Sequence, residues 1–354
     1  MIRATLAIDD AVGEHRRALL DPFGKPFRLE IERWSERGKR ARLDEVWWGR
    51  VRARMPGNRG WFVDVGLEDE GVVEPTRASA VTEGAMIPVR VKAEAWADKG
   101  AVLSLADMAA NVPRPDQPGK HSAPANDPFL RGVEVVATIK DQPARKQVEA
   151  AIEEAGERIV AIPGGGDLAI ESTRGLTAID VDSGNRATVN DPVAFALDLN
   201  LAAAEEAARQ IGLRGIGGLV AIDFVTMTQR RDHRSVVEGF RKSLAGWLGR
   251  ASEVLDLSTL GVCEAAIARR QRPVRDALSV APAEREGLDA LRGIESAGWS
   301  ARGARIRARV SVEASKWLEA DYIGWKEALA ARIGARWTIE TAERLPGRPE
   351  VWSA

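Results

Sequence analysis

The feature that most constrains this chain is a strand, helix and strand sequence between residues 176 and 224, in which both strands end in aspartate. The apolar runs 176–179 and 218–222 are followed by Asp180 and Asp223. Between them, Asn190 or Asp191 can cap a helix that continues to about Gly212. Such a unit predicts two neighbouring parallel strands with a right-handed crossover, although an intervening strand is allowed. We therefore expect both aspartates at one sheet edge, where α/β folds place ligands.

Two carboxylates at that edge predict a metal site. Neighbouring ionised carboxylates repel each other and need a cation, and oxygen ligands suit Mg²⁺ or Mn²⁺. Asp182 would face the same side as Asp180 if the strand continues, and would add a third carboxylate. Such a metal polarises a phosphoryl group and activates water, so phosphodiester hydrolysis is the implied reaction class. The alternative is that each aspartate only ends its strand and caps the following turn.

Length and composition limit the other classes. A chain of 354 residues with 45% hydrophobic and 29% charged residues predicts a folded protein of about two domains. The single cysteine, Cys263, excludes an intrachain disulfide and a multi-cysteine zinc site. No apolar run approaches a spanning helix, and the first ten residues do not read as a secretory leader, so we expect a cytoplasmic protein without membrane contact. The net charge of −1 does not indicate nucleic-acid binding by itself.

Short strands separated by turn residues dominate the region before residue 108. The expected strands are 47–54, 61–65, 72–74, 87–95 and 101–105. Five such strands predict a small barrel, for which the OB-fold is the common nucleic-acid-binding form. The Pro- and Gly-rich stretch 112–127 has the composition of a linker. The glycine-rich loop 163–167 predicts a hairpin turn, because a strand and not a helix follows it.

The segments around the two aspartates resemble the catalytic-strand motif of the ribonuclease E/G family. They read IESTRGLTAIDVDSG at 170–184 and GGLVAIDF at 217–224, with LNL at 199–201, AARQ at 207–210 and LR at 213–214 in the family's order and spacing. The barrel segments WFVDVG at 61–66 and DKGA at 98–101 stand where that family has an aromatic-bearing strand and a Lys-Gly turn.

The resemblance implies an Mg²⁺-dependent endoribonuclease that cuts single-stranded RNA and leaves 5′-phosphate ends. Asp180 and Asp223 would be the metal ligands. Asp182 would orient the first ligand, in the place of a residue that is more often Asn. Arg250 would match a basic residue that contacts RNA near the cut.

In the barrel, the resemblance assigns RNA binding to Phe62 and Lys99. An exposed aromatic ring stacks on a base without sequence choice, and a lysine neutralises a phosphate. Trp61, on the opposite face of its strand, is expected to pack in the barrel. Val72 stands where the family often has a second aromatic residue. Without the resemblance, Phe62 would be interpreted as a barrel core residue.

The implied fold is an α+β multidomain one: an OB-fold β-barrel RNA-binding domain inserted before a deoxyribonuclease-I-like/RNase H-like α/β catalytic domain, plus a small C-terminal α/β domain. We expect N-terminal strands packing with the catalytic region at 1–44, the barrel at 45–108, a linker at 109–131, the catalytic domain at 132–282 and the C-terminal domain at 283–354.

Three departures from the family limit what the resemblance implies. The insertion with which larger members sense a 5′-monophosphate is absent, so we expect no 5′-end sensing by that route. No cysteine lies between Arg272 and Glu284, so we expect no structural zinc and either a monomer or a zinc-independent dimer. Asp182 makes the site more negative, which would tighten metal binding or raise the pKa of one carboxylate. Two other functions are alternatives to the endoribonuclease: an RNA-binding protein with little or no catalysis, and a nuclease that acts on DNA.

Overall fold

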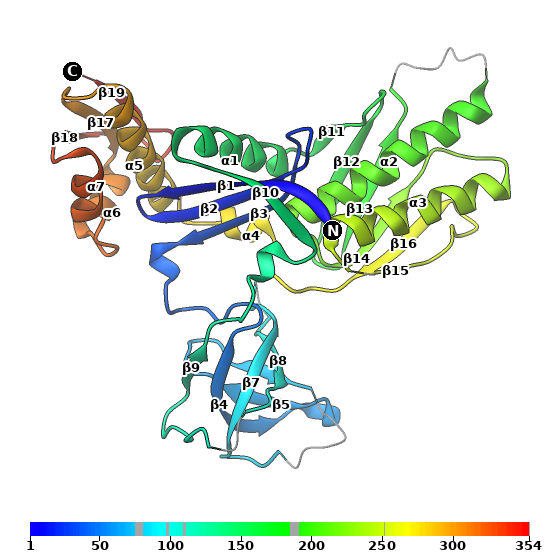
Figure 1. Ribbon diagram of the computed structural model, residues 1–354, viewed down its shortest axis with the longest axis horizontal. Coiled ribbons are helices and arrows are strands. Elements are labelled where there is room, and N and C mark those ends of the chain that lie inside the picture. The colour runs from blue at the N-terminus through cyan, green and yellow to red at the C-terminus, as the bar shows by residue number, and fades with distance from the viewer. Residues whose placement is uncertain (75–80, 97–98, 109–110, 185–190, 251, 354) are drawn as a thin grey trace.

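The chain forms four units, and three of them lie around a central one (Figure 1). The computed structural model describes residues 1–74, 81–96, 99–108, 111–184, 191–250 and 252–353. A four-stranded N-terminal sheet lies at the centre, with a barrel below it, a six-stranded sheet on one side and a small C-terminal unit on the other. The mixture of helices with a closed five-stranded barrel is consistent with the α+β fold and OB-like domain expected from the sequence.

The central sheet joins segments that are far apart in the chain. Its strands, in spatial order, are β10 (Val133–Lys140), β1 (Ile2–Ala11), β2 (Glu14–Leu20) and β3 (Pro26–Arg33). Helix α1 (Asp141–Gly156) packs on one face through Ala144, Val148 and Ala151. The sequence placed β10 and α1 in the catalytic domain, but β10 pairs in parallel with β1 and belongs here. The sequence predicts strands at 4–8 and 27–34, which correspond to β1 and β3, but it does not predict β2.

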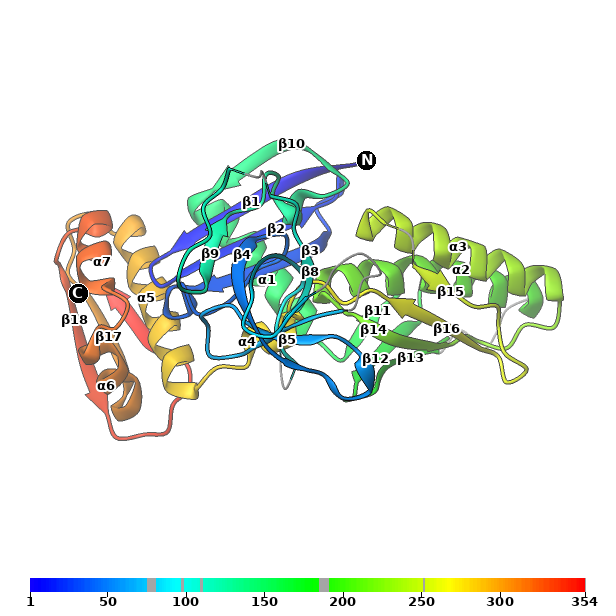
Figure 2. The ribbon, with the colours of Figure 1, turned by 90° about the horizontal axis from the view of Figure 1, so that it is seen from below.

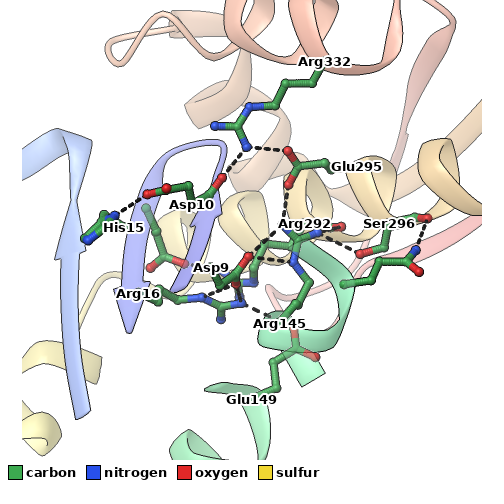
Figure 3. Close-up of polar contacts among 12 residues, drawn as sticks. Asp9, Asp10, His15, Arg16, Arg145, Glu149, Arg292, Glu295, Ser296 and Arg332 are labelled. Atoms are coloured by element: carbon green, nitrogen blue, oxygen red, sulfur yellow. Dashed lines mark hydrogen bonds and ion pairs between the residues drawn. The ribbon is translucent and has the colours of Figure 1, made fainter. Parts of the chain in front are cut away.

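A buried charged cluster joins this sheet to the C-terminal unit (Figure 3). The Nε atoms of Arg16 and Arg145 donate to the Asp9 carboxylate at 2.9 and 3.0 Å. Arg145 also pairs with Glu295, which in turn accepts a hydrogen bond from Arg332. Burial alone would raise the pKa of Asp9, but the two guanidinium groups more than offset it, and the pKa lies below its ordinary value of 3.8.

The barrel is inserted between β3 and β10. Its strands are β4 (Val46–Arg54), β5 (Trp61–Asp64), β6 (Gly71–Val73), β7 (Met86–Ala93) and β8 (Val102–Leu105). Pairing of β5 with β4 closes it, around a core that includes Val63, Val89 and Leu103. The segment expected as a linker contributes a further strand, β9 (Gly119–Ser122), which pairs with the outer side of β4.

The six-stranded sheet carries the two aspartates. Its strands, in spatial order, are β11 (Ile159–Ala161), β12 (Asp167–Ser172), β13 (Leu176–Asp182), β14 (Gly218–Asp223), β16 (Val262–Ile267) and β15 (Glu253–Val254). Helices α2 (Pro192–Arg214) and α3 (Arg230–Leu248) cover one face, and no helix lies over the other in Figure 2. Residues such as Ala203 and Phe240 of these helices pack with Ile179 and Ile222 of the strands.

The connections in this unit follow the sequence signals closely. The Asp191 side chain accepts hydrogen bonds from Val193 and Ala194 and so caps α2, whereas Asn190 lies outside the described residues. Gly215, at φ 64°, ends the same helix. The expected hairpin turn at 163–167 is confirmed, because β11 and β12 pair in antiparallel fashion across it.

The C-terminal unit packs helices on a three-stranded sheet. Its elements are α5 (Pro282–Ser300), β17 (Ile306–Ser311), α6 (Val312–Ala320), α7 (Trp325–Ile333), β18 (Trp337–Ala342) and β19 (Glu350–Ser353). The short helix α4 (Val274–Leu278) precedes it, and three 3₁₀ turns complete the fold: η1 (Trp34–Glu36), η2 (Pro56–Asn58) and η3 (Pro128–Leu130). Within the described residues, no helix has both the length and the apolar character needed to span a membrane.

Candidate active site

Asp180 and Asp223 are neighbours on adjacent strands. Strands β13 and β14 pair in parallel, with Asp180 directly opposite Asp223 in the register. Neighbouring strands lie about 4.8 Å apart, so the two side chains leave the sheet next to each other. The prediction of two parallel strands with no strand between them is confirmed. The alternating burial of the sequence explains the arrangement, because Ile179 and Ile222 face the helices and the aspartates face the open side.

Both carboxylates are exposed and free of ion pairs with the rest of the described chain. This separates them from Asp9, which is buried between two arginines and has no coordination position to offer. Mg²⁺ in proteins is commonly held by one or two carboxylates and keeps several waters. Two adjacent exposed carboxylates therefore fit such an ion, with room left for water and for phosphate oxygens.

The expected third carboxylate does not complete a three-ligand group. Asp182 lies on the same exposed face, two residues beyond Asp180, but its Oδ1 accepts a hydrogen bond from the backbone N–H of Gly184 at 2.7 Å. Among the described residues, no three His, Cys, Asp or Glu side chains are placed to hold one ion. A turn-capping contact explains the difference, since an aspartate at a strand end commonly accepts from the backbone two residues on.

The backbone of Gly166 lies close against the backbone of Asp182. Gly166 has φ +82°, and a Cβ there would lie 2.5 Å from the carbonyl oxygen of Asp182. Only glycine fits both the conformation and the contact. The glycine-rich hairpin therefore sets the position of the end of β13.

Asn200 holds the backbone of the loop that follows Asp223. This fully buried residue of α2 donates from Nδ2 to the carbonyl of Val225 at 2.7 Å and accepts from the Val225 N–H at 3.1 Å. From helix α3, His233 Nε2 lies 2.9 Å from the carbonyl of Met227 in the same loop. Asn200 is the middle residue of the LNL motif at 199–201, for which no role was predicted from the sequence. The sequence signal that could have indicated a structural role is a polar amide among the apolar residues of a helix.

Arg250 lies in a different place from the paired aspartates. Its Nη2 donates to the carbonyl of Ala268 at 2.8 Å, just after β16. Because β16 runs antiparallel to β14, Ala268 lies where β14 begins, about 17 Å along the strand from Asp223. Burial, followed by the charges of Arg270 and Arg131, lowers the pKa of Arg250 to about 10. The structure therefore groups Arg250 with other arginines and not with the carboxylate pair.

The two barrel residues also differ in their surroundings. Trp61 packs against the barrel core, whereas Phe62 is half-buried on the opposite face of β5, opposite Val72. Lys99 is exposed, and its Nζ lies 5.7 Å from the ring centroid of Trp96. Asp98, the first residue of the expected Lys-Gly turn segment, lies outside the described residues.

The family model and the relatives that match this chain carry the same family name. Residues 125–272 match the model of the Ribonuclease E/G family. Ribonuclease E of Escherichia coli is 40% identical over 118 residues, which cover 33% of this chain and 11% of that protein. Ribonuclease E of Nostoc is 40% identical over 121 residues, which cover 33% and 17%.

A plant protein gives the same result. The chloroplastic Ribonuclease E/G-like protein of Arabidopsis thaliana is 37% identical over 100 residues, which cover 28% of this chain and 10% of that protein. The aligned segments thus span less than a fifth of each of these relatives. The family match extends over the parallel strand pair with Asp180 and Asp223, so this region of the chain is similar to the ribonuclease E/G family.

Proposed function

We propose that this chain is a metal-dependent endoribonuclease that hydrolyses single-stranded RNA and leaves 5′-phosphate ends. The observation that carries the proposal is the parallel register of Asp180 and Asp223 on an open sheet face, within the region that matches the family. The names of the relatives support a ribonuclease activity.

In this proposal Asp180 and Asp223 hold one Mg²⁺, with Mn²⁺ as a substitute. A bound ion of this kind would polarise the scissile phosphate and lower the pKa of the attacking water. Asn200 holds the turn after Asp223 so that the pair keeps its spacing.

The placement of the pair supports a strand-like substrate. The carboxylates lie on the uncovered face of a sheet, where an extended polymer has access along its length. Single-stranded RNA is recognised through unstacked bases and phosphates. We assign stacking on one base to Phe62 and neutralisation of phosphates to Lys99. Arg250 would contact the RNA backbone away from the cut, because it lies at the opposite end of β14.

The direct test is cleavage of a 5′-labelled single-stranded RNA with Mg²⁺ or with chelator. Fragments should appear only with Mg²⁺ and should carry 5′-phosphates on their newly formed ends. Asp180→Asn and Asp223→Asn should each reduce the rate by at least about a hundredfold, because each removes a ligand charge. RNA affinity, measured in chelator, should change little.

A matched control is available on the same sheet. Glu253 is an exposed carboxylate on the edge strand β15, opposite Ala266 and so on the open face. Glu253→Gln should leave the cleavage rate unchanged. Equal cleavage rates for the parent, Asp180→Asn and Asp223→Asn would remove the proposed mechanism.

A second candidate is an RNA-binding protein without cleavage. It is favoured by one observation: the described residues gather two carboxylates but no three-ligand group. In that case RNA would bind with the same affinity in Mg²⁺ and in chelator and would remain intact in both.

A further inference from the structure

A cavity of about 440 Å³ lies between the barrel and the start of β13, away from the paired aspartates. It is lined by the end of α1, the turn between β12 and β13, the end of α2 and the segment around α4. Leu176 lines it and stands four residues before Asp180, which is about 13 Å along the strand. The cavity is therefore a separate site on the same sheet.

Positive charge dominates the lining. Among the described residues that line it there are one carboxylate, Glu157, and six arginines, which are Arg158, Arg174, Arg214, Arg269, Arg275 and Arg285. Of these, Arg158 pairs with Glu171 outside the lining. Arg275 donates to the carbonyl of Ser172 at 3.0 Å, and Arg285 donates to the carbonyl of Leu278 at 2.9 Å. Neither forms an ion pair with any residue that the structure describes. Arg285 is influenced by the charge of Asp289, and both guanidinium groups can also contact an anion.

Arg269 adds an unused donor to this cavity. Its Nε is buried and has no hydrogen-bond partner in the described part of the chain. Two glycines leave space for the side chain, since a Cβ at Gly218 would lie 2.7 Å from its Nη2. Buried polar groups in folded proteins are normally satisfied. An acceptor supplied by a ligand would complete this one.

An aromatic ring and an apolar floor accompany the charge. The guanidinium carbon of Arg269 lies 5.1 Å from the centroid of Trp96, a barrel residue that also lines the cavity. Leu176 and Ile216 supply apolar surface. Indole and guanidinium planes both stack with nucleobases, and the volume lies in the range of small-molecule sites.

We propose that this cavity binds a nucleotide. Its phosphate lies against Arg275 and Arg285, and its base stacks on the layer formed by Trp96 and Arg269. The nucleotide is either a free nucleoside phosphate or one nucleotide of an RNA strand, and only the second source rests on the proposed function. Both sources share the same chemistry and are separated by the test.

The test uses the full chain carrying Asp180→Asn, so that any RNA stays intact, and measures dissociation constants by titration calorimetry. The probes are AMP, ADP, inorganic phosphate and a single-stranded RNA decamer with 5′-hydroxyl ends. Arg275→Gln and Arg285→Gln should each weaken binding of the relevant nucleotide probe about tenfold, because a charged hydrogen bond is lost. Trp96→Ala should weaken it about tenfold as well, and Trp96→Phe should restore most of the affinity.

The control is Arg348→Gln, which removes an exposed arginine of the C-terminal unit and should change no affinity. Loss of ADP affinity in the cavity variants would assign a free nucleotide, and loss confined to the RNA decamer would assign an RNA nucleotide. Unchanged affinities for all four probes would overturn the proposal, as would inorganic phosphate binding as tightly as ADP with no effect of Trp96→Ala. Failure of RNA cleavage by the parent chain is a separate result, because these titrations need no catalysis.

Discussion

The side-chain amide of Asn200 pairs with both backbone groups of Val225, so the loop after Asp223 is tied to the middle of α2. No solvent reaches this contact from the helix side, since Asn200 is fully buried. An interaction on the helix-covered side of the sheet thus holds the backbone two residues after Asp223.

Replacing Asn200 by Leu should affect stability and cleavage together. The Val225 N–H and C=O would lose their partners inside the fold, which costs about 1–3 kcal/mol for each unsatisfied group. We expect a lower free energy of unfolding in urea and a cleavage rate reduced at least tenfold, with RNA affinity nearly unchanged. Asp198→Asn, an exposed change on the same helix, should leave all three values alone. Full cleavage activity in a destabilised Asn200→Leu protein would show that the contact is only structural.

The Asp182→Asn variant should fold as well as the parent. An asparagine Oδ1 can accept the same hydrogen bond from Gly184, so the turn is preserved. One negative charge is removed beside the pair, and we therefore expect RNA cleavage to continue but to need several-fold more Mg²⁺ for half-maximal rate. A titration of cleavage rate against Mg²⁺ measures this. If Asp182→Asn is as inactive as Asp180→Asn, then Asp182 is itself a ligand and not a turn residue.

Phe62→Ala should weaken binding of single-stranded RNA by about 1–3 kcal/mol without a large loss of stability, because the ring lies on the outer face of β5. Fluorescence anisotropy with a labelled RNA in chelator gives the affinity, and thermal melting gives the stability. Trp61→Ala should have the opposite effect. Because that ring packs on the barrel core, its loss should lower the melting temperature. If the RNA affinity is unchanged in Phe62→Ala, then Phe62 packs against the barrel and does not bind RNA.

The Asp9→Asn variant should be less stable by about 3–5 kcal/mol at pH 7, because two buried arginines would lose their shared counter-charge. The pKa of Asp9 in the folded chain lies below 3.8, so its stabilisation is complete above that value. The stabilisation is lost as pH falls through the folded-state pKa. The difference in unfolding free energy between parent and variant should accordingly shrink below about pH 3.8. Asp10→Asn, at an exposed position, should show neither effect.

The parts of the fold that sequence reasoning found have strong local signals. The five barrel strands, the capped helix after Asp191 and the two strands ending in aspartate all follow from short-range residue patterns. What it missed depends on distant partners. Strand β2 contains Arg16, a residue that would normally be exposed, and it is buried only because Asp9 on β1 neutralises it. The assignment of β10 likewise depends on a partner more than a hundred residues away.

The candidate site divides in the same way. Asp180 and Asp223 could be paired from the sequence because a strand, helix and strand unit fixes which ends of the strands coincide. Arg250 could not be placed, because its position depends on where α3 ends and on the antiparallel register of β16. The arginine cavity was also not predicted. Its lining comes from the barrel, from helices α1, α2, α4 and α5, from strands β12 and β13 and from the segments that connect them, and no local pattern joins them.

The insertion of the barrel between β3 and β10 determines the order in which this chain can be completed during synthesis. About a hundred residues separate the end of β3 from β10, and β1 has its second neighbour only when β10 arrives. In a nascent chain on the ribosome, one hydrogen-bonding edge of β1 therefore stays unpaired until the whole barrel and then β10 have emerged. The barrel can close during that interval, because its strands pair only with one another and with β9, which also precedes β10.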